Sequence, residues 1–143
     1  MSRMIFVNLP VADLDAAKAF YEAIGAVNNP QFTDETAACM VFSDTIFVML
    51  LTHEKFAEFT PKKIADAHAT SEVLIALSAE SREGVDEIAD KALAAGGRES
   101  RERQDYGFMY ARSFEDLDGH IWEPMWMDLE AATEAMQPET ADA

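Results

Sequence analysis

Hydrophobic and polar positions along the chain predict the same order of elements twice. Residues 4–11 form an apolar run of strand length, and Asp13 is placed to cap a following helix by accepting free backbone N–H groups. The apolar face of this helix has helical spacing and consists of Leu14, Ala17, Phe20, Tyr21 and Ile24. Gly25 then ends the helix, because glycine adopts the left-handed conformation without steric cost. Three short strand-like runs follow, near residues 27–33, 37–43 and 45–52.

The pattern begins again at residue 72. Residues 72–79 are strand-like, and Ser81 is placed to cap a second helix. The apolar face of that helix consists of Val85, Ile88, Ala89, Ala92 and Leu93. Gly96 and Gly97 end the helix, and three strand-like runs follow, near residues 98–104, 107–114 and 120–127. An order of strand, helix and three strands that occurs twice indicates a duplicated module.

A more polar segment, residues 53–71, separates the two repeats. Within it, Thr60 followed by Pro61 predicts the start of a short helix near residues 61–69. We therefore interpret residues 1–127 as one domain followed by an acidic C-terminal tail, residues 128–143. The domain consists of module one (4–52), a linker (53–71) and module two (72–127).

The last strand-like run, residues 120–127, is apolar on both faces. One face carries Ile121, Glu123, Met125 and Met127, and the other carries Trp122 and Trp126. A strand covered on both faces is typical of a sheet with helices outside and a packed interior. Pro10 and Pro124 predict that their strand ends lie at an edge or a bend, because proline donates no hydrogen bond to a ladder.

Composition excludes several classes of partner. Asp and Glu total 27 against 11 Lys and Arg, and the formal net charge of -16 repels nucleic acid and anionic membranes. A single cysteine, Cys39, permits no intramolecular disulfide. No apolar run approaches the roughly 20 residues of a membrane span, and the N-terminus lacks the apolar core of a signal peptide. We therefore expect a cytoplasmic protein.

Two motifs stand out, one near each end of the domain. The first runs from Phe6 to Leu14 and is followed by Phe20-Tyr21 and Gly25, and the second is Asp-Leu-Asp-Gly-His-Ile-Trp-Glu at residues 116–123. In this order they resemble the vicinal-oxygen-chelate superfamily of glyoxalases, bleomycin-resistance proteins and extradiol dioxygenases. The first is similar to the family's opening strand and helix, and the second to its Asp-Pro-Asp-Gly turn, which leads to a metal-binding glutamate. The resemblance implies an α+β fold, in which two βαβββ modules form a curved mixed sheet around a central cup with the helices outside.

The resemblance also implies four metal-ligand positions, from the first and last strand of each module in glyoxalase-type members. The matching residues are Phe6, Met49, Leu74 and Glu123. Only Glu123 offers a hard donor, because phenylalanine and leucine have no lone pair and a thioether suits soft ions. We therefore expect no cofactor and no metal at these positions. This expectation argues against glyoxalase I chemistry, which needs a metal to polarise the substrate.

A shifted metal site is the alternative. Side chains on one strand face recur every two residues, so Asn8, His53 and Glu72 could join Glu123 in an oxygen and nitrogen site. Such a site would take a divalent metal such as zinc, nickel or iron. The protein would then be an enzyme, a metal-dependent lyase or isomerase related to lactoylglutathione lyase.

The sequence favours a binding protein over this enzyme, although both remain open. We predict a mainly apolar cup that holds a small molecule, with Glu123 as its one carboxylate, either a ligand anchor or a catalytic base. The predicted pocket residues are Phe6, Asn8, Met49, Leu51, Leu74, Glu123 and Met125. Arg98, Arg101 and Arg103 form a basic cluster that is either a solvated edge or an anion-binding rim. Because family members complete their cups by pairing modules, within or between chains, we also expect a homodimer.

Overall fold

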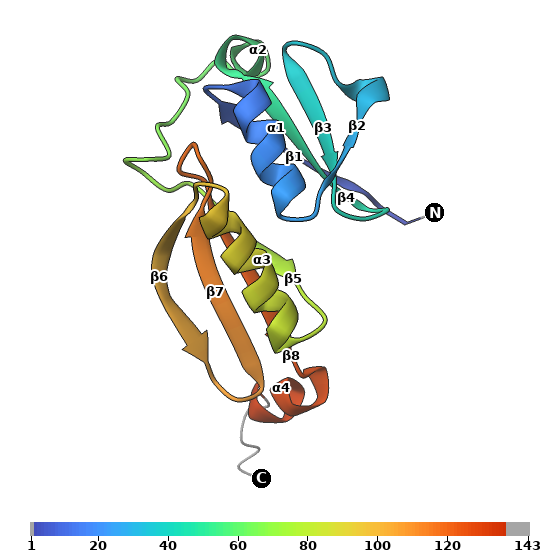
Figure 1. Ribbon diagram of the computed structural model, residues 1–143, viewed down its shortest axis with the longest axis vertical. Helices are drawn as coiled ribbons and strands as arrows, with labels where there is room; N and C mark the ends of the chain where they lie inside the picture. The colour runs from blue at the N-terminus through green and yellow to red at the C-terminus, as the bar shows by residue number, and fades with distance from the viewer. Residues whose placement is uncertain (1, 137–143) are drawn as a thin grey trace.

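The computed structural model describes residues 2–136 and confirms the α+β fold of two βαβββ modules (Figure 1). Module one contains β1 (Ile5–Val11), α1 (Leu14–Ala23), β2 (Val27–Asn29), β3 (Ala37–Val41) and β4 (Ile46–Thr52). Module two contains β5 (Leu74–Ser78), α3 (Arg82–Ala94), β6 (Arg98–Asp105), β7 (Met109–Glu115) and β8 (Ile121–Met127). Shorter helices are η1 (Pro30–Phe32), α2 (His53–Ala57) and α4 (Leu129–Met136). Within residues 2–136, no helix is long and apolar enough to cross a membrane.

Each module forms a four-stranded mixed sheet with its last strand inside. The strand orders are β1-β4-β3-β2 and β5-β8-β7-β6, and the pairs β1–β4 and β5–β8 are parallel. The other pairs are antiparallel. Helices α1 and α3 both lie on the same side of the molecule, in front of their sheets in Figure 1. The opposite face of each sheet, called the inner face below, is therefore the face without a long helix.

The predicted helix caps are confirmed. The Asp13 carboxylate accepts a hydrogen bond from the Ala16 N–H at 3.0 Å, and the Ser81 hydroxyl accepts one from the Gly84 N–H at 3.0 Å. Both caps satisfy N–H groups that have no partner inside the helix. Gly25 follows the end of α1 with a φ of 110°, the left-handed conformation expected there.

The prediction of a helix over residues 61–69 is wrong. The linker helix is instead α2, where the Thr52 hydroxyl accepts a hydrogen bond from the Lys55 N–H. The Thr60 hydroxyl accepts only from the Lys62 N–H, and the Asp66 carboxylate accepts from the His68 N–H. Such local side-chain bonds favour turns over a continuous helix.

Two other segments differ from what the sequence predicted. The run 27–33 is a strand only to Asn29, because Pro30 starts η1 and cannot donate to the ladder. In the predicted acidic tail, residues 129–136 form helix α4, whose Ala132 is buried. The rest of that tail, residues 137–143, lies outside the described residues.

The two prolines also lie in different settings. Pro10 lies in β1, an edge strand, as predicted. Pro124 lies in β8, a central strand, so of the two predicted settings, an edge or a bend, the edge does not apply to this residue. Pro124 pairs with Leu77 of β5, but the ladder to β7 is interrupted at Glu123 and Pro124. The interruption fits a residue that has no N–H group to donate.

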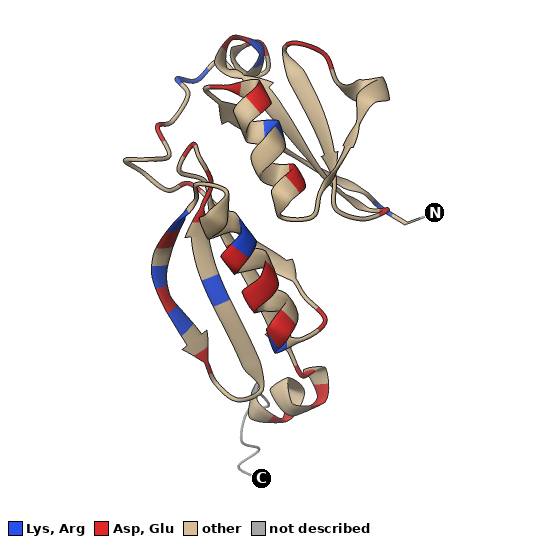
Figure 2. Cartoon of the chain, in the orientation of Figure 1, with Lys and Arg blue, Asp and Glu red and all other residues tan. Residues whose placement is uncertain are grey.

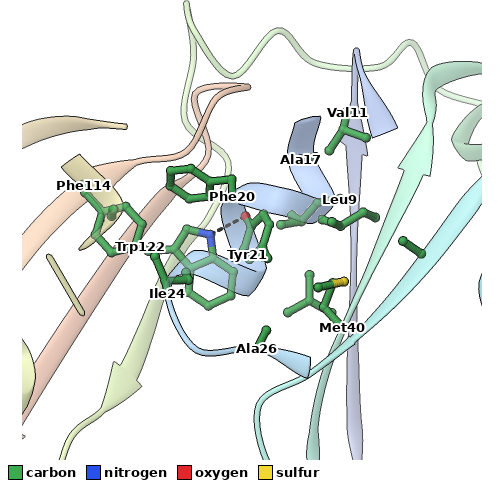
Figure 3. Packing of buried hydrophobic residues seen from close by; sticks show 14 residues of the cluster. Leu9, Val11, Ala17, Phe20, Tyr21, Ile24, Ala26, Met40, Phe114 and Trp122 are labelled. Carbon is green, nitrogen blue, oxygen red and sulfur yellow. Dashed lines mark hydrogen bonds between the residues drawn. The ribbon is translucent and has the colours of Figure 1, made fainter. Parts of the chain in front are cut away.

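One hydrophobic core joins the two modules. Phe20 and Tyr21 of α1 are almost completely buried, and they pack against Phe114 and Trp122 of module two (Figure 3). The rings of Tyr21 and Trp122 meet edge to face at 5.7 Å. Such contacts between large aromatic rings contribute beyond the area they bury. The modules are thus held together through α1 rather than through their inner faces.

A hydrogen-bond network runs through the same junction. The Tyr21 hydroxyl donates to the Asp116 carboxylate and accepts a 2.9 Å hydrogen bond from the Trp122 indole N–H. The second carboxylate oxygen of Asp116 accepts from the N–H groups of Asp118 and His120, each at 2.9 Å. The turn between β7 and β8 is therefore fixed to helix α1 of module one.

The β7–β8 turn also contacts β1 and the linker. The Asp118 carboxylate accepts from the Ala12 N–H at 2.8 Å, and His120 Nε2 lies 2.8 Å from the Pro10 carbonyl oxygen. Gly119 has a φ of 90°, and a Cβ atom there would lie 2.7 Å from backbone atoms of the linker. Only glycine fits this close approach, which fixes the path of the linker.

Burial raises the pKa of the Asp116 carboxyl above its ordinary value of 3.8, mainly by desolvation. The folded state therefore holds this proton more tightly than the unfolded state. The contribution of the Asp116 carboxyl to the free energy of unfolding is fully present below about pH 4. It is lost as the pH rises through the raised pKa. We expect the free energy of unfolding of Asp116→Asn, relative to the natural protein, to increase as the pH rises from 4 to 7. Urea unfolding at a series of pH values measures this difference.

Asp105 provides a control of opposite sign. Its hydrogen bonds from Arg82 lower the pKa of the Asp105 carboxyl to about 2. The stabilisation that Asp105 contributes is fully present above about pH 4 and is lost as the pH falls toward its folded-state pKa of about 2. Asp105→Asn should therefore differ most from the natural protein near neutral pH and least near pH 2. An identical pH dependence for the two variants would contradict the assignment for Asp116.

Candidate ligand-binding site

The alternation of side chains along the strands places several predicted residues on the inner faces. Val7, Leu9 and Val11 of β1 pack against the α1 side of the first sheet, so Phe6 and Asn8 point to the other side. Likewise, Val48 and Leu50 of β4 belong to the core with α1. Their neighbours Met49 and Leu51 therefore belong to the inner face.

The inner face of the first sheet contains an open hollow of about 600 Å³. Phe6 and Phe47 are stacked in it with ring centroids 4.7 Å apart, and Phe6 remains 49% exposed. Polar side chains contribute little here, because Asn29 is the one polar residue in the lining. The lining residues are Met4, Phe6, Asn29, Phe32, Cys39, Phe47 and Met49.

The inner face of the second sheet contains the predicted carboxylate. Glu123 has an 18% exposed side chain, and its carboxylate accepts a 2.9 Å hydrogen bond from Nη2 of Arg101, which is 49% exposed. Met125 shares this face by strand alternation, as does Leu74, which is 57% exposed. The predicted pocket did not include Arg101, whose guanidinium lies against the Glu123 carboxylate and compensates its charge.

Asn8 and Leu51 share the inner side of the first sheet by alternation but do not line its hollow of about 600 Å³. The Asn8 side chain donates to the Phe6 carbonyl oxygen at 3.2 Å, and Leu51 is almost fully buried. Asn8 and Glu72 both line a smaller hollow of about 200 Å³ beneath the linker, beside His120. The structure thus brings Phe6 and Met49 into one hollow and places Asn8 and Glu72 in another.

The residues of the shifted metal site do not form a metal centre. Across residues 2–136, no group of three or more His, Cys, Asp or Glu side chains is arranged to hold a metal ion. His53 is exposed at the start of α2, and Glu72 is exposed ahead of β5. Glu123 already binds a guanidinium group. At the four positions given by the family resemblance, one ion-paired carboxylate and one thioether do not fit a hard divalent metal.

Five lining residues of the hollow are not among the predicted pocket residues: Met4, Asn29, Phe32, Cys39 and Phe47. Cys39 lies opposite Met49 in the ladder and lines the hollow, and burial raises the pKa of its thiol. It is therefore a poor nucleophile and a small apolar lining residue. Phe47 and Asn29 reach the hollow through the registers of β4 and β2, which the sequence pattern does not define. The one sequence signal that could have placed Phe47 in the lining was its alternation with the core residue Val48.

Comparison with known proteins gives the family. A family model described as the glyoxalase/bleomycin resistance protein/dioxygenase superfamily matches residues 3–123. The chain belongs to this superfamily. No curated protein sequence matches the chain. The superfamily assignment therefore defines the fold and leaves the specific activity to be inferred from the site.

Several solved structures resemble this superfamily member over most of its length. A hypothetical protein, SA1046 from S. aureus, is 28% identical with a TM-score of 0.73, covering 88% of this chain and 95% of that one. A family enzyme from Burkholderia phytofirmans PsJN is 16% identical with a TM-score of 0.72, covering 88% and 99%. FosX from Listeria monocytogenes, a fosfomycin resistance protein complexed with Mn(II) and sulfate, is 20% identical with a TM-score of 0.70, covering 96% and 99%.

The ion pair leads to a prediction about metals in this superfamily member. We expect zinc, nickel and iron(II) to bind Glu123 weakly, since the Arg101 guanidinium already occupies its carboxylate and Phe6 and Leu74 add no donor. Elemental analysis of untagged protein, with titration of each metal, measures this. One metal per chain that is lost in Glu123→Gln would contradict the prediction and support a metal-dependent lyase. Glu22→Gln on α1 provides a control for metal binding at an exposed carboxylate outside any candidate site.

Proposed function

We propose that this superfamily member binds a small, mainly apolar molecule against the inner face of its first sheet and has no glyoxalase I activity. The observation that carries the proposal is the hollow of about 600 Å³ lined by aromatic and sulfur-containing side chains. Ligand pockets typically measure about 300 to 1,000 Å³ and have mainly hydrophobic linings. The donor chemistry of the four family positions supports the part of the proposal that concerns glyoxalase I activity, because that reaction needs a metal to polarise the substrate.

The composition of the lining supports an apolar, ring-containing ligand. The stacked pair of Phe6 and Phe47 presents a flat aromatic surface. Met49 and Met4 lie in the same lining, and thioether side chains adapt their shape and contact aromatic rings favourably. Water forms few hydrogen bonds with such a surface. A planar apolar molecule that displaces this water binds favourably, because its own apolar surface and that of the hollow are both buried.

Binding of N-phenyl-1-naphthylamine, a neutral fluorescent probe, tests the proposal. We expect the natural protein to bind it, and Phe6→Lys to weaken binding at least about tenfold, since a charge would be desolvated beneath the probe. Fluorescence titration measures both affinities. Phe6 is 49% exposed, so the substitution is compatible with the fold. The matched control is Leu129→Lys on α4, where the leucine is 74% exposed and outside the hollow. Equal binding by both variants would contradict the proposal.

The unprotected strand edges support a homodimer that completes the binding cup. Of the four edge strands, β6 consists entirely of polar and charged residues and β2 has three residues. Figure 2 shows the alternating basic and acidic positions along β6. By contrast, β1 and β5 are apolar edges, with Ile5 58% and Leu74 57% exposed. Long apolar edges in native proteins are normally covered.

A second copy of the chain is the occupant that fits these edges. It presents the same apolar edges and inner faces, so a two-fold interface is self-complementary. The open side of the hollow would then be closed by the partner's inner face. Because the modules of one chain meet through α1, this arrangement leaves the inner faces available to the second copy.

Light scattering at micromolar concentration tests the dimer. We expect about twice the chain mass of 15.8 kDa for the natural protein and a lower mass for Leu74→Lys, which would place an unpaired charge in the interface. Leu129→Lys again serves as the control and should remain dimeric. A mass of 15.8 kDa for the natural protein would overturn the dimer.

A further inference from the structure

Two irregularities in β6 turn Arg101 toward the inner face. The register with β7 shifts between Glu99 and Arg101 and again between Arg101 and Gln104. Arg101 lies opposite Ser113, and Gln104 lies opposite Ala111, whereas Glu99 lies opposite the core residue Phe114. Residues that face each other across a ladder share one face of the sheet. Bulges of this kind re-aim side chains, and here they bring a cation to the face that carries Glu123.

The Arg101 guanidinium is held in position by two acceptors, but some of its N–H donors remain unused. Its Nη2 donates to Glu123 at 2.9 Å and to Gln104 at 3.0 Å. An arginine offers five N–H donors, and within residues 2–136 Nε and Nη1 of Arg101 have no hydrogen-bond partner. The side chain is 49% exposed. The two acceptors thus restrain a guanidinium whose remaining donors are accessible.

The arginines on the helix side of the same sheet are used differently. Arg112 is buried and donates to Asp86 and Asp90 of α3. Arg82 makes a two-bond contact with Asp105, at 2.8 and 2.9 Å. These residues join elements of the fold through their carboxylate partners, and Nε of Arg112 is buried without a hydrogen-bond partner among residues 2–136. Arg101 instead pairs with Ser113 on a sheet face that also carries the apolar residues Ala111 and Met125.

We propose that Arg101 determines ligand specificity by binding a compact oxyanion, a carboxylate or phosphate, carried by the apolar molecule. This inference rests on the proposed function and its dimer, since the apolar body of the ligand occupies the hollow on the first sheet of one chain and Arg101 reaches it from the second sheet of the other. Guanidinium groups bind such oxyanions through charge-assisted hydrogen bonds. The large negative charge of the chain opposes anions at long range, but screening limits that effect to about 8 Å at physiological ionic strength. Contact with the guanidinium therefore dominates once the ligand is bound.

Displacement of N-phenyl-1-naphthylamine by three related competitors tests the inference. The competitors are 1-naphthoate, 1-naphthyl phosphate and the neutral 1-naphthalenemethanol. For the natural protein we expect at least one anion to compete about tenfold better than the alcohol. One charge-assisted hydrogen bond typically contributes an affinity difference of about this size. The better of the two anions identifies the ligand class. In Arg101→Gln the advantage of the anion should disappear, while affinity for the alcohol should change less than about twofold.

Two further variants separate the role of Arg101 from repulsion by an unpaired Glu123. The double variant Arg101→Gln with Glu123→Gln removes both charges, and we expect it to lack the preference for anions as well. Recovery of the preference in the double variant would overturn the inference, as would equal competition by all three compounds in the natural protein. Arg103→Gln is the control on the same strand, because Arg103 donates to the Tyr110 hydroxyl on the helix side. Failure of the natural protein to bind the probe at all would instead overturn the proposed function, and this inference with it.

Discussion

The contact of Tyr21 with Asp116 and Trp122 is the constraint on which the arrangement of the two modules depends. It connects a helix of module one to the last turn and last strand of module two. The three side chains satisfy one another's polar atoms inside an aromatic core, where an unsatisfied group would be strongly destabilising. Because the helix side of both sheets is used for this junction, the inner faces remain open for binding.

The open faces differ in chemistry, although the two modules share one topology. The first sheet presents aromatic rings and thioethers, whereas the second presents an ion pair beside methionine and alanine. Duplicated modules thus retain the same backbone pattern while one inner face becomes apolar and the other keeps charge. A carboxylate that is paired with a guanidinium is stable on such a face without a metal, because its charge is already compensated.

The sequence predicted the elements that local chemistry determines. Asp13 and Ser81 define helix starts through their own side chains, and the alternation around Trp122 identifies its two faces. The partner of Glu123 could not be predicted, because Arg101 reaches it only through two register shifts in β6. The linker helix was misplaced for a related reason, since several short capping motifs compete and tertiary contacts select among them.

The strand order has a consequence for how the chain folds. In both sheets the strand made last is inserted between strands made earlier, so β5 has no partner until β8 arrives. The parallel ladder from Leu74 to Ile121 therefore closes late, and it requires a long loop to be ordered first. During synthesis, module one has all its strands once Thr52 has left the ribosome, whereas β5 of module two waits for the C-terminal strand. A chain that ends before Ile121 would leave two apolar strands without their central neighbour, exposed to aggregation.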